Sequence, residues 1–297
     1  MAAQVTIAGQ KPTLVPLDGQ LFDLQSTLFS GQTFRWRKEG EWYDGVVFGN
    51  VIRLRTVDGG IEFISSPDDE HVIAPHLRDY FSLDIDLDEV YVALSRDENF
   101  TGPIEKYRGM RVLRQDPWET TLSFLCAQNS NVQRITKNVE DLCETFGLPV
   151  TLGEHTRHTY PTPESLANAG EQAIRDLGLG YRARFITSVA AEVAEGKTDL
   201  WALREAEYDE ALDVLTSLNG IGDKVANCIM LFSMDKPEAF PVDTHIAKGI
   251  AEWYTNSDAA KTSDTQKMRA WAQARFGRHA GYANHYLFHS RRLAPKP

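Results

Sequence analysis

Two apolar, helix-like segments meet at Leu218-Asn219-Gly220-Ile221-Gly222-Asp223-Lys224-Val225-Ala226, and this stretch decides the fold of the chain. Its two glycines let the backbone turn sharply, and Ile221 anchors the turn in the core. The backbone amides at the start of the second helix then point outward with no side chains in front of them, as an anion site requires. The stretch predicts a helical hairpin that binds a nucleic-acid phosphate. A plain helical hairpin with a glycine-rich turn is the alternative.

Lys224 falls in the first turn of the second helix, where the helix dipole disfavours a cation by up to about 1 kcal/mol. The same field, with partial burial, favours the neutral amine, which is the nucleophilic form. Asp243 follows nineteen residues later and is expected to cap the next helix, where backbone N–H groups keep its carboxylate ionised. A neutral lysine and a fixed carboxylate in one cleft suit attack on a sugar carbon that passes through a cationic state. The alternative for Asp243 is a helix cap and nothing more.

The rest of the chain changes from strand periodicity to helix periodicity. Strands are expected at 34–38, 42–48, 51–57 and 61–65, with Gly- and Asn-containing turns between them. Helices are expected at 87–94, from Pro117 with Asp116 as N-cap, at 132–146 up to Gly147, and near 164–177, 182–195, 206–217, 224–234, 244–254, 264–275 and 280–292. The predicted fold class is α+β. A small antiparallel β domain over 1–85 precedes a mostly helical domain over 86–297, with a cleft between two helical lobes.

The composition excludes several classes of protein. The 297 residues, 42% hydrophobic and 25% charged, are those of a globular chain, which excludes disordered and fibrous proteins. The longest apolar run without a charge, 225–234, is about half a membrane span, and the N-terminus lacks a secretory signal pattern. Cys126, Cys143 and Cys228 are widely spaced, which predicts neither a disulfide framework nor a metal pair. We expect a soluble intracellular protein, in the cytoplasm and nucleoid or in the nucleus, without metal or other cofactor.

The net charge of −11 argues, as a sum, against a polyanionic partner. The charges are unevenly distributed, however. Residues 79–98 hold seven acids against one base, whereas residues 268–297 hold six bases and no acid. An acidic protein can still offer one basic face to DNA, and the alternative is an acidic protein with a basic tail. Charge alone does not decide between them.

Several further motifs occur in a fixed order along the chain. They are Ser30-Gly31-Gln32-Thr33-Phe34-Arg35-Trp36, Arg111-Val112-Leu113-Arg114-Gln115-Asp116-Pro117, Cys126 to Arg134, Gly178-Leu179-Gly180-Tyr181-Arg182-Ala183-Arg184, and Asp235-Lys236-Pro237 leading into Pro241-Val242-Asp243. Together with the hairpin lysine, they resemble the 8-oxoguanine DNA glycosylase/AP lyase family of the helix-hairpin-helix (HhH-GPD) superfamily along almost the whole chain. The absence of a four-cysteine cluster after Asp243 weighs against the iron–sulfur branch typified by endonuclease III.

The resemblance implies an enzyme of base-excision repair that excises 8-oxoguanine, opposite cytosine, from double-stranded DNA. Lys224 would attack C1′ of the damaged nucleotide and expel the base, and the resulting Schiff base would permit β-elimination of the 3′ phosphate. Asp243 would stabilise the cationic sugar and help to activate the lysine. The expected partner is DNA, with no membrane, and the expected oligomeric state is a monomer.

The resemblance also implies a pocket for the flipped base. The carbonyl of Gly31 would read the N7 hydrogen that oxidised guanine has and guanine lacks. Phe288 and Cys228 would sandwich the base. Asn284 would meet its pairing edge, and Pro241 would belong to the same pocket. Without the resemblance, the sequence favours an ordinary place in the core for Phe288 and Cys228.

The remaining implied contacts are with the DNA around the lesion. Asn129, Arg134 and Arg182 would contact the orphaned cytosine, and Tyr181 would wedge into the base stack. His245 and the hairpin amides from Gly220 to Gly222 would hold phosphate. Each of these side chains has a structural alternative. Arg134 and Arg182 could be solvated surface arginines, Tyr181 could cap a helix turn, and His245 could be an ordinary histidine at a helix start.

Three positions depart from the family pattern. The usual three asparagines of the central loop are here Asn129-Ser130-Asn131, Asn284 stands where a Gln is usual, and Arg291 where an acidic residue is usual. These changes leave the lysine chemistry intact, but at these positions the resemblance does not establish base selectivity or opposite-base preference for this chain. Two other functions remain open: a monofunctional alkylbase glycosylase, which would lack the hairpin lysine, and a non-catalytic helix-hairpin-helix DNA-binding protein.

Overall fold

The computed structural model describes residues 11–293, and their contacts divide the chain into two compact units. The sheet unit comprises the chain up to Gln20, Thr33–Asp84 and Thr121–Thr198. The hairpin unit comprises Leu21–Gln32, Ile85–Thr120 and the chain from Asp199 onward. The chain passes from one unit to the other between Asp84 and Ile85, where the sequence predicts a domain boundary, and also at 20/21, 32/33, 120/121 and 198/199.

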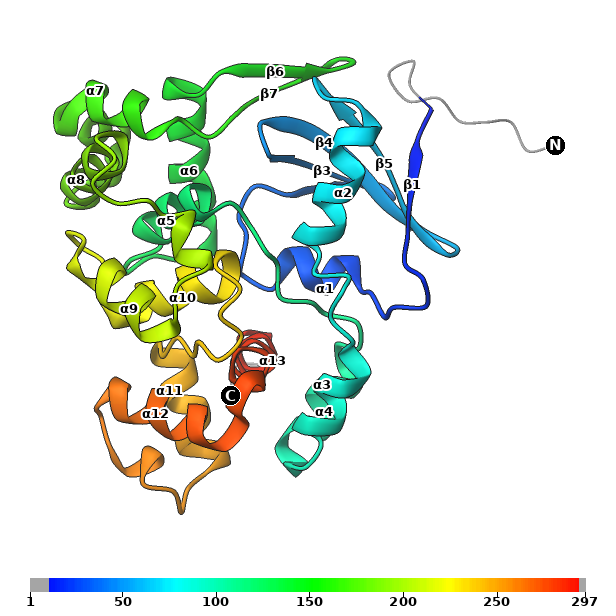
Figure 1. Cartoon of the computed structure of the whole chain (residues 1–297), viewed down its shortest axis with the longest axis vertical. Coiled ribbons are helices and arrows are strands. Elements are labelled where there is room, and N and C mark those ends of the chain that lie inside the picture. Colours follow the sequence, from blue (N-terminus) through cyan, green and yellow to red (C-terminus); the bar gives the residue numbers. More distant parts are fainter. Residues whose placement is uncertain (1–10, 294–297) are drawn as a thin grey trace. The chain divides into compact units, whose positions relative to one another are not determined.

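A five-stranded antiparallel sheet forms the centre of the sheet unit (Figure 1). Its strands are β1 (Thr13–Pro16), β2 (Arg37–Glu39), β3 (Trp42–Val47), β4 (Asn50–Val57) and β5 (Gly60–Ser66), in the spatial order β1-β5-β4-β3-β2. On β4, Ile52 and Leu54 are buried while Arg53 and Arg55 are partly exposed, as in a half-buried strand. Thr56, which the period of two places on the buried face, is exposed. The first expected strand, 34–38, is displaced to Arg37–Glu39. β1 was not predicted, because its four residues become a strand only by pairing with the distant β5.

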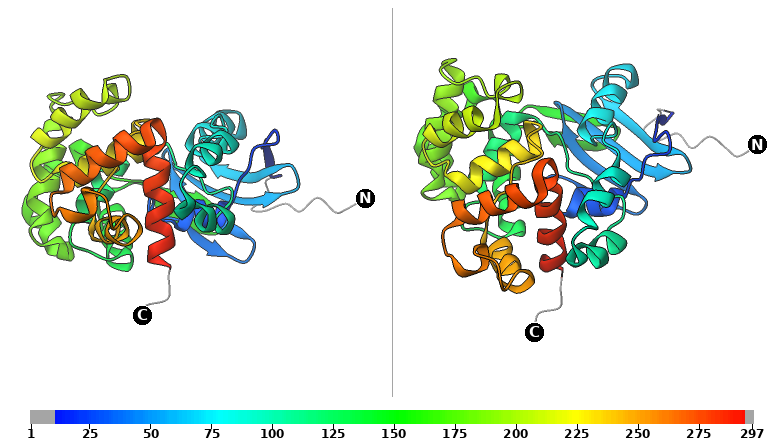
Figure 2. Two further views of the ribbon diagram at one scale, coloured as in Figure 1. Left: turned by 90° about the horizontal axis from the view of Figure 1, so that it is seen from below. Right: turned by 60° about the horizontal axis from the view of Figure 1, so that its bottom comes forward.

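The other elements of the sheet unit are helical apart from one hairpin (Figure 2). They are α2 (Glu70–Tyr80), α6 (Val132–Phe146), β6 (Pro149–Leu152), β7 (His155–His158), α7 (Pro163–Ile174), a π-helical turn (Arg175–Leu179) and α8 (Arg182–Ala194). α5 (Pro117–Cys126) begins in the hairpin unit and ends here. The β6–β7 hairpin packs on β4 and β5 and was not predicted. The bounds of α6 agree with the prediction, as Asn131 caps its start and Gly147 ends it.

The hairpin unit contains the helices that follow Asp199 and three short helices from earlier in the chain. Its α-helices are α1 (Leu24–Phe29), α3 (Leu87–Leu94), α4 (Thr101–Lys106), α9 (Tyr208–Ser217), α10 (Asp223–Ser233), α11 (Thr244–Trp253), α12 (Thr265–Phe276) and α13 (Ala280–Arg292). Short 3₁₀ turns occupy Glu98–Phe100, Ala202–Arg204, Ala259–Lys261 and Gly277–His279. Phe240, Ile246, Ile250, Met268 and Leu287 belong to one buried cluster among α11, α12 and α13.

The α+β class and the order of a β region before a helical region are therefore confirmed. The helices expected after residue 86 agree with the observed ones to within about two residues at most ends, apart from the 164–177 segment, whose last turn is π-helical. Within residues 11–293, no helix combines the length and apolarity needed to cross a membrane. The same residues hold no group of three or more His, Cys, Asp or Glu that could bind a metal, and the three cysteines are buried and form no disulfide within this range.

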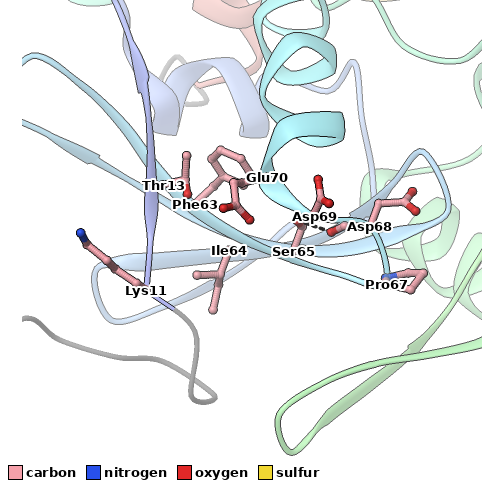
Figure 3. A pocket seen from close by; sticks show the side chains of 9 residues that line it. All are labelled: Lys11, Thr13, Phe63, Ile64, Ser65, Pro67, Asp68, Asp69 and Glu70. Atoms are coloured by element: carbon pink, nitrogen blue, oxygen red, sulfur yellow. Dashed lines mark hydrogen bonds between the residues drawn. The ribbon is translucent and has the colours of Figure 1, made fainter.

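A pocket of the sheet unit lies between β1, β5 and the start of α2 (Figure 3). Three consecutive acids, Asp68, Asp69 and Glu70, line one side of it. The carboxylate of Asp69 accepts from His71 N and Val72 N and so caps α2, and Asp68 accepts from the side chain of Asn50. None of the site residues predicted from sequence lines this pocket.

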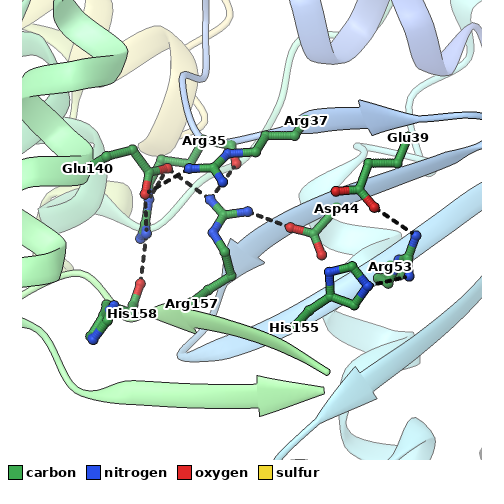
Figure 4. Close-up of polar contacts among 9 residues, drawn as sticks. All are labelled: Arg35, Arg37, Glu39, Asp44, Arg53, Glu140, His155, Arg157 and His158. Carbon is green, nitrogen blue, oxygen red and sulfur yellow. Dashed lines mark hydrogen bonds and ion pairs between the residues drawn. The ribbon is translucent and has the colours of Figure 1, made fainter. Parts of the chain in front are cut away.

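A buried network of charges joins the sheet to α6 and β7 (Figure 4). Arg35 donates two hydrogen bonds of 3.2 Å to the carboxylate of Glu140 on α6. Arg157 on β7 donates to the same carboxylate at 2.8 Å and also pairs with Asp44 on β3. Burial by itself would raise the pKa of Glu140, but the charges of Arg35, Arg157 and Arg37 outweigh it and lower that pKa.

We expect Glu140→Gln to lower the free energy of unfolding at pH 7 by about 3–5 kcal/mol, because Arg35 would remain buried without its carboxylate. A carboxyl whose folded-state pKa is lowered stabilises the fold above its unfolded-state pKa, about 4.3 for Glu, and this contribution is lost as the pH falls through the folded-state pKa. Urea unfolding of both proteins from pH 7 to pH 3 should show that the variant lacks this part of the pH dependence.

Glu39→Gln is the matched control, because Glu39 pairs with Arg53 at 3.1 Å from a position where its side chain is 45% exposed. Loss of this surface pair should cost less than about 1 kcal/mol. If Glu140→Gln and Glu39→Gln lower the free energy of unfolding equally, burial does not strengthen the ion pairs of Glu140.

Candidate active site

The predicted helical hairpin is formed by α9 and α10, joined by residues 218–222. Gly220 has φ +85°, a conformation that a side chain at this position would strain, and Ile221 is buried in the turn. Gly222 is the N-cap of α10 and brings no side chain to its amides. The first amides of α10 are therefore not capped by a side chain of the N-cap residue, which leaves them suited to an anion.

Lys224 is the second residue of α10 and is partly buried. Its amine hydrogen-bonds the thiol of Cys228, one turn later on the same helix. Burial raises the pKa of this thiol, Lys224 lowers it in part, and the negative charge of Asp243 raises it. The pKa of the Cys228 thiol therefore responds to the charges of both Lys224 and Asp243, which indicates that both residues lie near this buried thiol.

Asp243 is the N-cap of α11, as predicted, and its Oδ1 accepts from Ile246 N at 2.8 Å. This hydrogen bond holds the carboxylate at the start of the helix. Asp223, the acid next to the lysine in sequence, pairs instead with Arg269 at 3.0 Å. Asp243 remains the carboxylate that the sequence predicts to act with the lysine.

Asn227 positions these elements and was not singled out from the sequence. Its Oδ1 accepts from Tyr208 Oη at 2.7 Å and from Phe240 N at 3.2 Å, and its Nδ2 donates to Asp223 O at 2.8 Å. It therefore joins α9, the start of α10 and the segment leading to Asp243. The signal for it was an amide side chain inside the uncharged, mostly apolar run 225–234.

The loop that carries Gly31 is held rigidly within the hairpin unit. Gln32 donates to Thr27 O and Arg111 O, both at 2.8 Å, and accepts from Leu113 N at 2.9 Å. Gly31 itself has φ +95°, and a Cβ added there would lie 3.1 Å from Cε1 of Phe288. The backbone thus approaches the Phe288 ring in a conformation that favours glycine.

The side chains of α13 complete this region. Asn284 is buried and its Nδ2 donates to Pro241 O at 2.8 Å. Phe288 is partly exposed, and the ring of His245 meets it edge-on with centroids 5.8 Å apart. The structure therefore brings Gly31, Phe288 and His245 together, and ties Asn284 to Pro241, two residues before Asp243.

The residues predicted to meet the opposite strand belong to the sheet unit. Arg182 is buried, and its guanidinium donates to Gln128 O at 3.0 Å and to Asn129 O at 3.3 Å. Asn129 has φ +47° and donates from Nδ2 to Tyr181 Oη at 3.2 Å, while the Tyr181 ring is 45% exposed. Arg134 is exposed near the start of α6, and its side chain makes no hydrogen bond or ion pair with residues 11–293. Asn129, Tyr181 and Arg182 form one cluster, which Arg134 does not join through such a bond.

Of the departures from the family pattern, Arg291 has a clear local partner. It pairs with both carboxylate oxygens of Glu252 on α11, one of them at 3.0 Å. The charge of Arg291 is therefore largely neutralised by a surface carboxylate.

Comparison with known proteins gives matches along most of the chain. The model of the 8-oxoguanine DNA glycosylase N-terminal domain matches residues 14–121, and that of HhH-GPD superfamily base excision DNA repair proteins matches residues 122–273. The N-glycosylase/DNA lyase OGG1 of Arabidopsis thaliana is 35% identical over 282 residues, which cover 89% of this chain and 76% of the relative.

Two solved structures are similar over nearly the full length. One is MBOgg1 in complex with a low-affinity DNA ligand, with a TM-score of 0.87 and 30% identity, covering 95% of this chain and 99% of that one. The other is the Clostridium acetobutylicum 8-oxoguanine glycosylase/lyase with double-stranded DNA containing cytosine opposite 8-oxoG, with a TM-score of 0.85 and 29% identity, covering 91% and 92%.

Proposed function

The chain belongs to the 8-oxoguanine DNA glycosylase family of the HhH-GPD superfamily, and from this premise we propose that it excises 8-oxoguanine from DNA through Lys224 and then cleaves the strand. The observation that carries the assignment of Lys224 is the group of three side chains at the hairpin. The lysine amine lies at the N-terminal turn of α10, hydrogen-bonded to Cys228, with the Asp243 carboxylate close enough to affect the same thiol. This is a nucleophile with an adjacent fixed negative charge.

Lys224 is the nucleophile of this group, and Cys228 is not. A thiol attacks as the thiolate, and burial raises the pKa of Cys228, so that it stays protonated at neutral pH. The Lys224 amine adds to C1′ while the bond from C1′ to the base breaks. The base leaves with the electron pair of that bond and takes up the proton that the lysine nitrogen releases. The Asp243 carboxylate stabilises the positive charge that develops on the sugar.

Strand cleavage follows from the covalent adduct. Once the base has left and the sugar ring has opened, the lysine nitrogen forms a Schiff base with C1′. The imine acidifies the C2′ proton, and loss of that proton expels the 3′ phosphate. An enzyme without this amine would use water and stop at an abasic site, as a monofunctional alkylbase glycosylase does.

The base pocket is assigned to the residues around α13. The Gly31 carbonyl would accept from N7–H of the oxidised base, and the Phe288 ring would stack on one face, opposite Cys228. Since Pro241 O accepts one N–H of Asn284, the carbonyl oxygen and the second N–H of this amide are left for the pairing edge of the base.

The DNA around the lesion is assigned to both units. Phosphate would be held by the turn from Gly220 to Gly222, by the first amides of α10, which no N-cap side chain covers, and by His245 at the start of α11. Asn129, Tyr181, Arg182 and Arg134 would meet the strand opposite the lesion. Because Arg182 already holds two main-chain carbonyls, it would contribute both by shaping the Gln128–Asn129 loop and by contacting cytosine. We propose that the protein acts as a monomer inside the cell.

Phe288→Ala is expected to reduce excision of 8-oxoguanine about tenfold or more, because stacking on an aromatic ring is worth about 1–3 kcal/mol per base. Cleavage at a pre-formed abasic site should change little, because no base then needs to be held. Single-turnover rates on the two duplexes measure this. Equal losses on both would show that Phe288 supports the fold and not the base pocket.

Borohydride trapping tests the proposed function as a whole. Protein incubated with borohydride and duplex DNA containing 8-oxoguanine opposite cytosine should form a covalent adduct, and undamaged duplex should not. Excision without an adduct would identify a monofunctional glycosylase, and binding without excision would identify a non-catalytic DNA-binding protein. Either result overturns the proposal.

A further inference from the structure

Arg292, the last residue of α13, contacts both sides of the proposed base pocket. Its Nη2 donates a hydrogen bond to Phe29 O, the last carbonyl of α1. Its Nη1 lies 3.5 Å from the position of a Cβ built on Gly31, and its guanidinium carbon lies 6.0 Å from the ring centroid of Phe288. The Arg292 side chain therefore lies against the backbone at Phe29, against Gly31, and near the Phe288 ring that is expected to stack on the base.

The helix geometry separates Arg292 from its basic neighbour. Successive residues of an α-helix point about 100° apart, so that Arg291 and Arg292 meet different surroundings. Arg291 pairs with Glu252, whereas Arg292 forms no ion pair with any carboxylate within residues 11–293. Its Nε is buried and has no hydrogen-bond partner among those residues.

A half-buried cation without a counter-charge is a cost to the fold. Burial lowers the pKa of Arg292, although an arginine remains protonated at neutral pH. Its guanidinium donates to the C-terminal carbonyl of α1, where a cation interacts favourably with the helix dipole. A side chain that destabilises the fold and also contacts a binding pocket is expected to serve the function of that pocket.

We propose that Arg292 is a positioning residue for base recognition: it locks the Gly31 loop to Phe288, so that the carbonyl that reads N7–H and the ring that stacks keep one spacing. The inference rests on the proposed function. A misplacement of about 1 Å in such a group costs about 100-fold in rate. The role requires both the cation and its planar fork, since one nitrogen donates to Phe29 O while the guanidinium carbon lies 6.0 Å from the centroid of the Phe288 ring.

Arg292→Met keeps the length of the side chain and removes the cation and its donors. We expect the single-turnover rate of 8-oxoguanine excision to fall about 10- to 100-fold, with cleavage of a pre-formed abasic site within twofold of wild type. Arg292→Lys should recover part of the loss, because an ammonium can reach Phe29 O but lacks the fork. Arg291→Met is the matched control, and its ratio of excision to abasic-site cleavage should equal that of wild type.

A double-mutant cycle with Phe288→Ala asks whether Arg292 acts through the ring. If it does, the double variant should excise no more than about threefold more slowly than Phe288→Ala alone, because the effects of coupled residues do not add. Independent, multiplying losses would overturn the positioning role. So would an unchanged excision rate in Arg292→Met, or equal losses on 8-oxoguanine and abasic duplexes, including losses caused by unfolding. Failure of the wild-type protein to excise 8-oxoguanine would contradict the proposed function instead, which distinguishes the two failures.

Discussion

Replacing Lys224 by Gln is expected to abolish both base excision and strand cleavage while the protein still binds duplex DNA. Glutamine is nearly as long as lysine and forms helices about as well, so α10 should persist. Removal of a cation from the first turn of a helix is itself favourable by up to about 1 kcal/mol, and the melting temperature should therefore not fall. The loss of activity should reach at least about 10⁴-fold, since removing the nucleophile of a catalytic group costs several orders of magnitude.

Lys248→Gln provides the control, because Lys248 is an exposed lysine on α11 of the same unit. It should retain the wild-type rate and still be trapped by borohydride, whereas Lys224→Gln should give no adduct. Undiminished excision in Lys224→Gln would show that another group attacks the sugar. Loss of strand cleavage alone would show that Lys224 serves the lyase step and that water expels the base.

Asp243→Asn is expected to lower the excision rate by about 10²–10³-fold with little change in DNA affinity. The carboxylate is held at the start of α11 by its hydrogen bond from Ile246 N, so that its charge is preorganised to face the cationic sugar. Loss of one such preorganised electrostatic group costs about 3–4 kcal/mol in the transition state. The helix should remain capped, because Asn is about as good an N-cap as Asp.

Asp264→Asn separates the charge from the cap. Asp264 caps α12 through Oδ1, which accepts from Gln266 N and Lys267 N, and it has no proposed role in the reaction. Both Asn variants should melt within a few degrees of wild type, and only Asp243→Asn should lose activity. If Asp243→Asn instead lowers the melting temperature and keeps the wild-type excision rate, Asp243 is a structural cap and its charge does not stabilise the transition state.

The parts of the site that could be predicted from the residues alone depend on neighbours within about four positions. Gly220 and Gly222 set the turn, and Asp116 and Asp243 cap their helices as predicted, because caps and turns are local hydrogen-bonding patterns. Asn131 also caps its helix, although this cap was not predicted. The position of Lys224 in a helix's first turn followed from the same reasoning. The functions of Phe288 and Cys228, in contrast, came only from the resemblance to a family, since an isolated Phe or Cys is compatible with any core.

The elements missed by the sequence prediction depend on distant partners. β1 is a strand because it pairs with β5, and β6 and β7 form a short hairpin that packs on β4 and β5. Strand formation reports packing and pairing more than intrinsic preference, so that a segment of four residues carries little signal of its own. The six-residue helix α1 was missed for a similar reason, because a helix this short is stable only where tertiary contacts support it.

The residues alone predicted the helical hairpin, the place of Lys224 in its second helix, Asp243 as an N-cap and the order of a β region before a helical one. These features can be predicted because periodicity, caps and glycine turns depend on only a few neighbouring residues. Only the tertiary structure decided that Gly31 lies against Phe288, that Asn227 joins α9 and α10 to the segment before Asp243, and that Arg292 meets the end of α1. Contacts between residues far apart in the chain form when the free energy gained by packing exceeds the entropic cost of closing long loops. No local pattern records which distant surface will supply that packing.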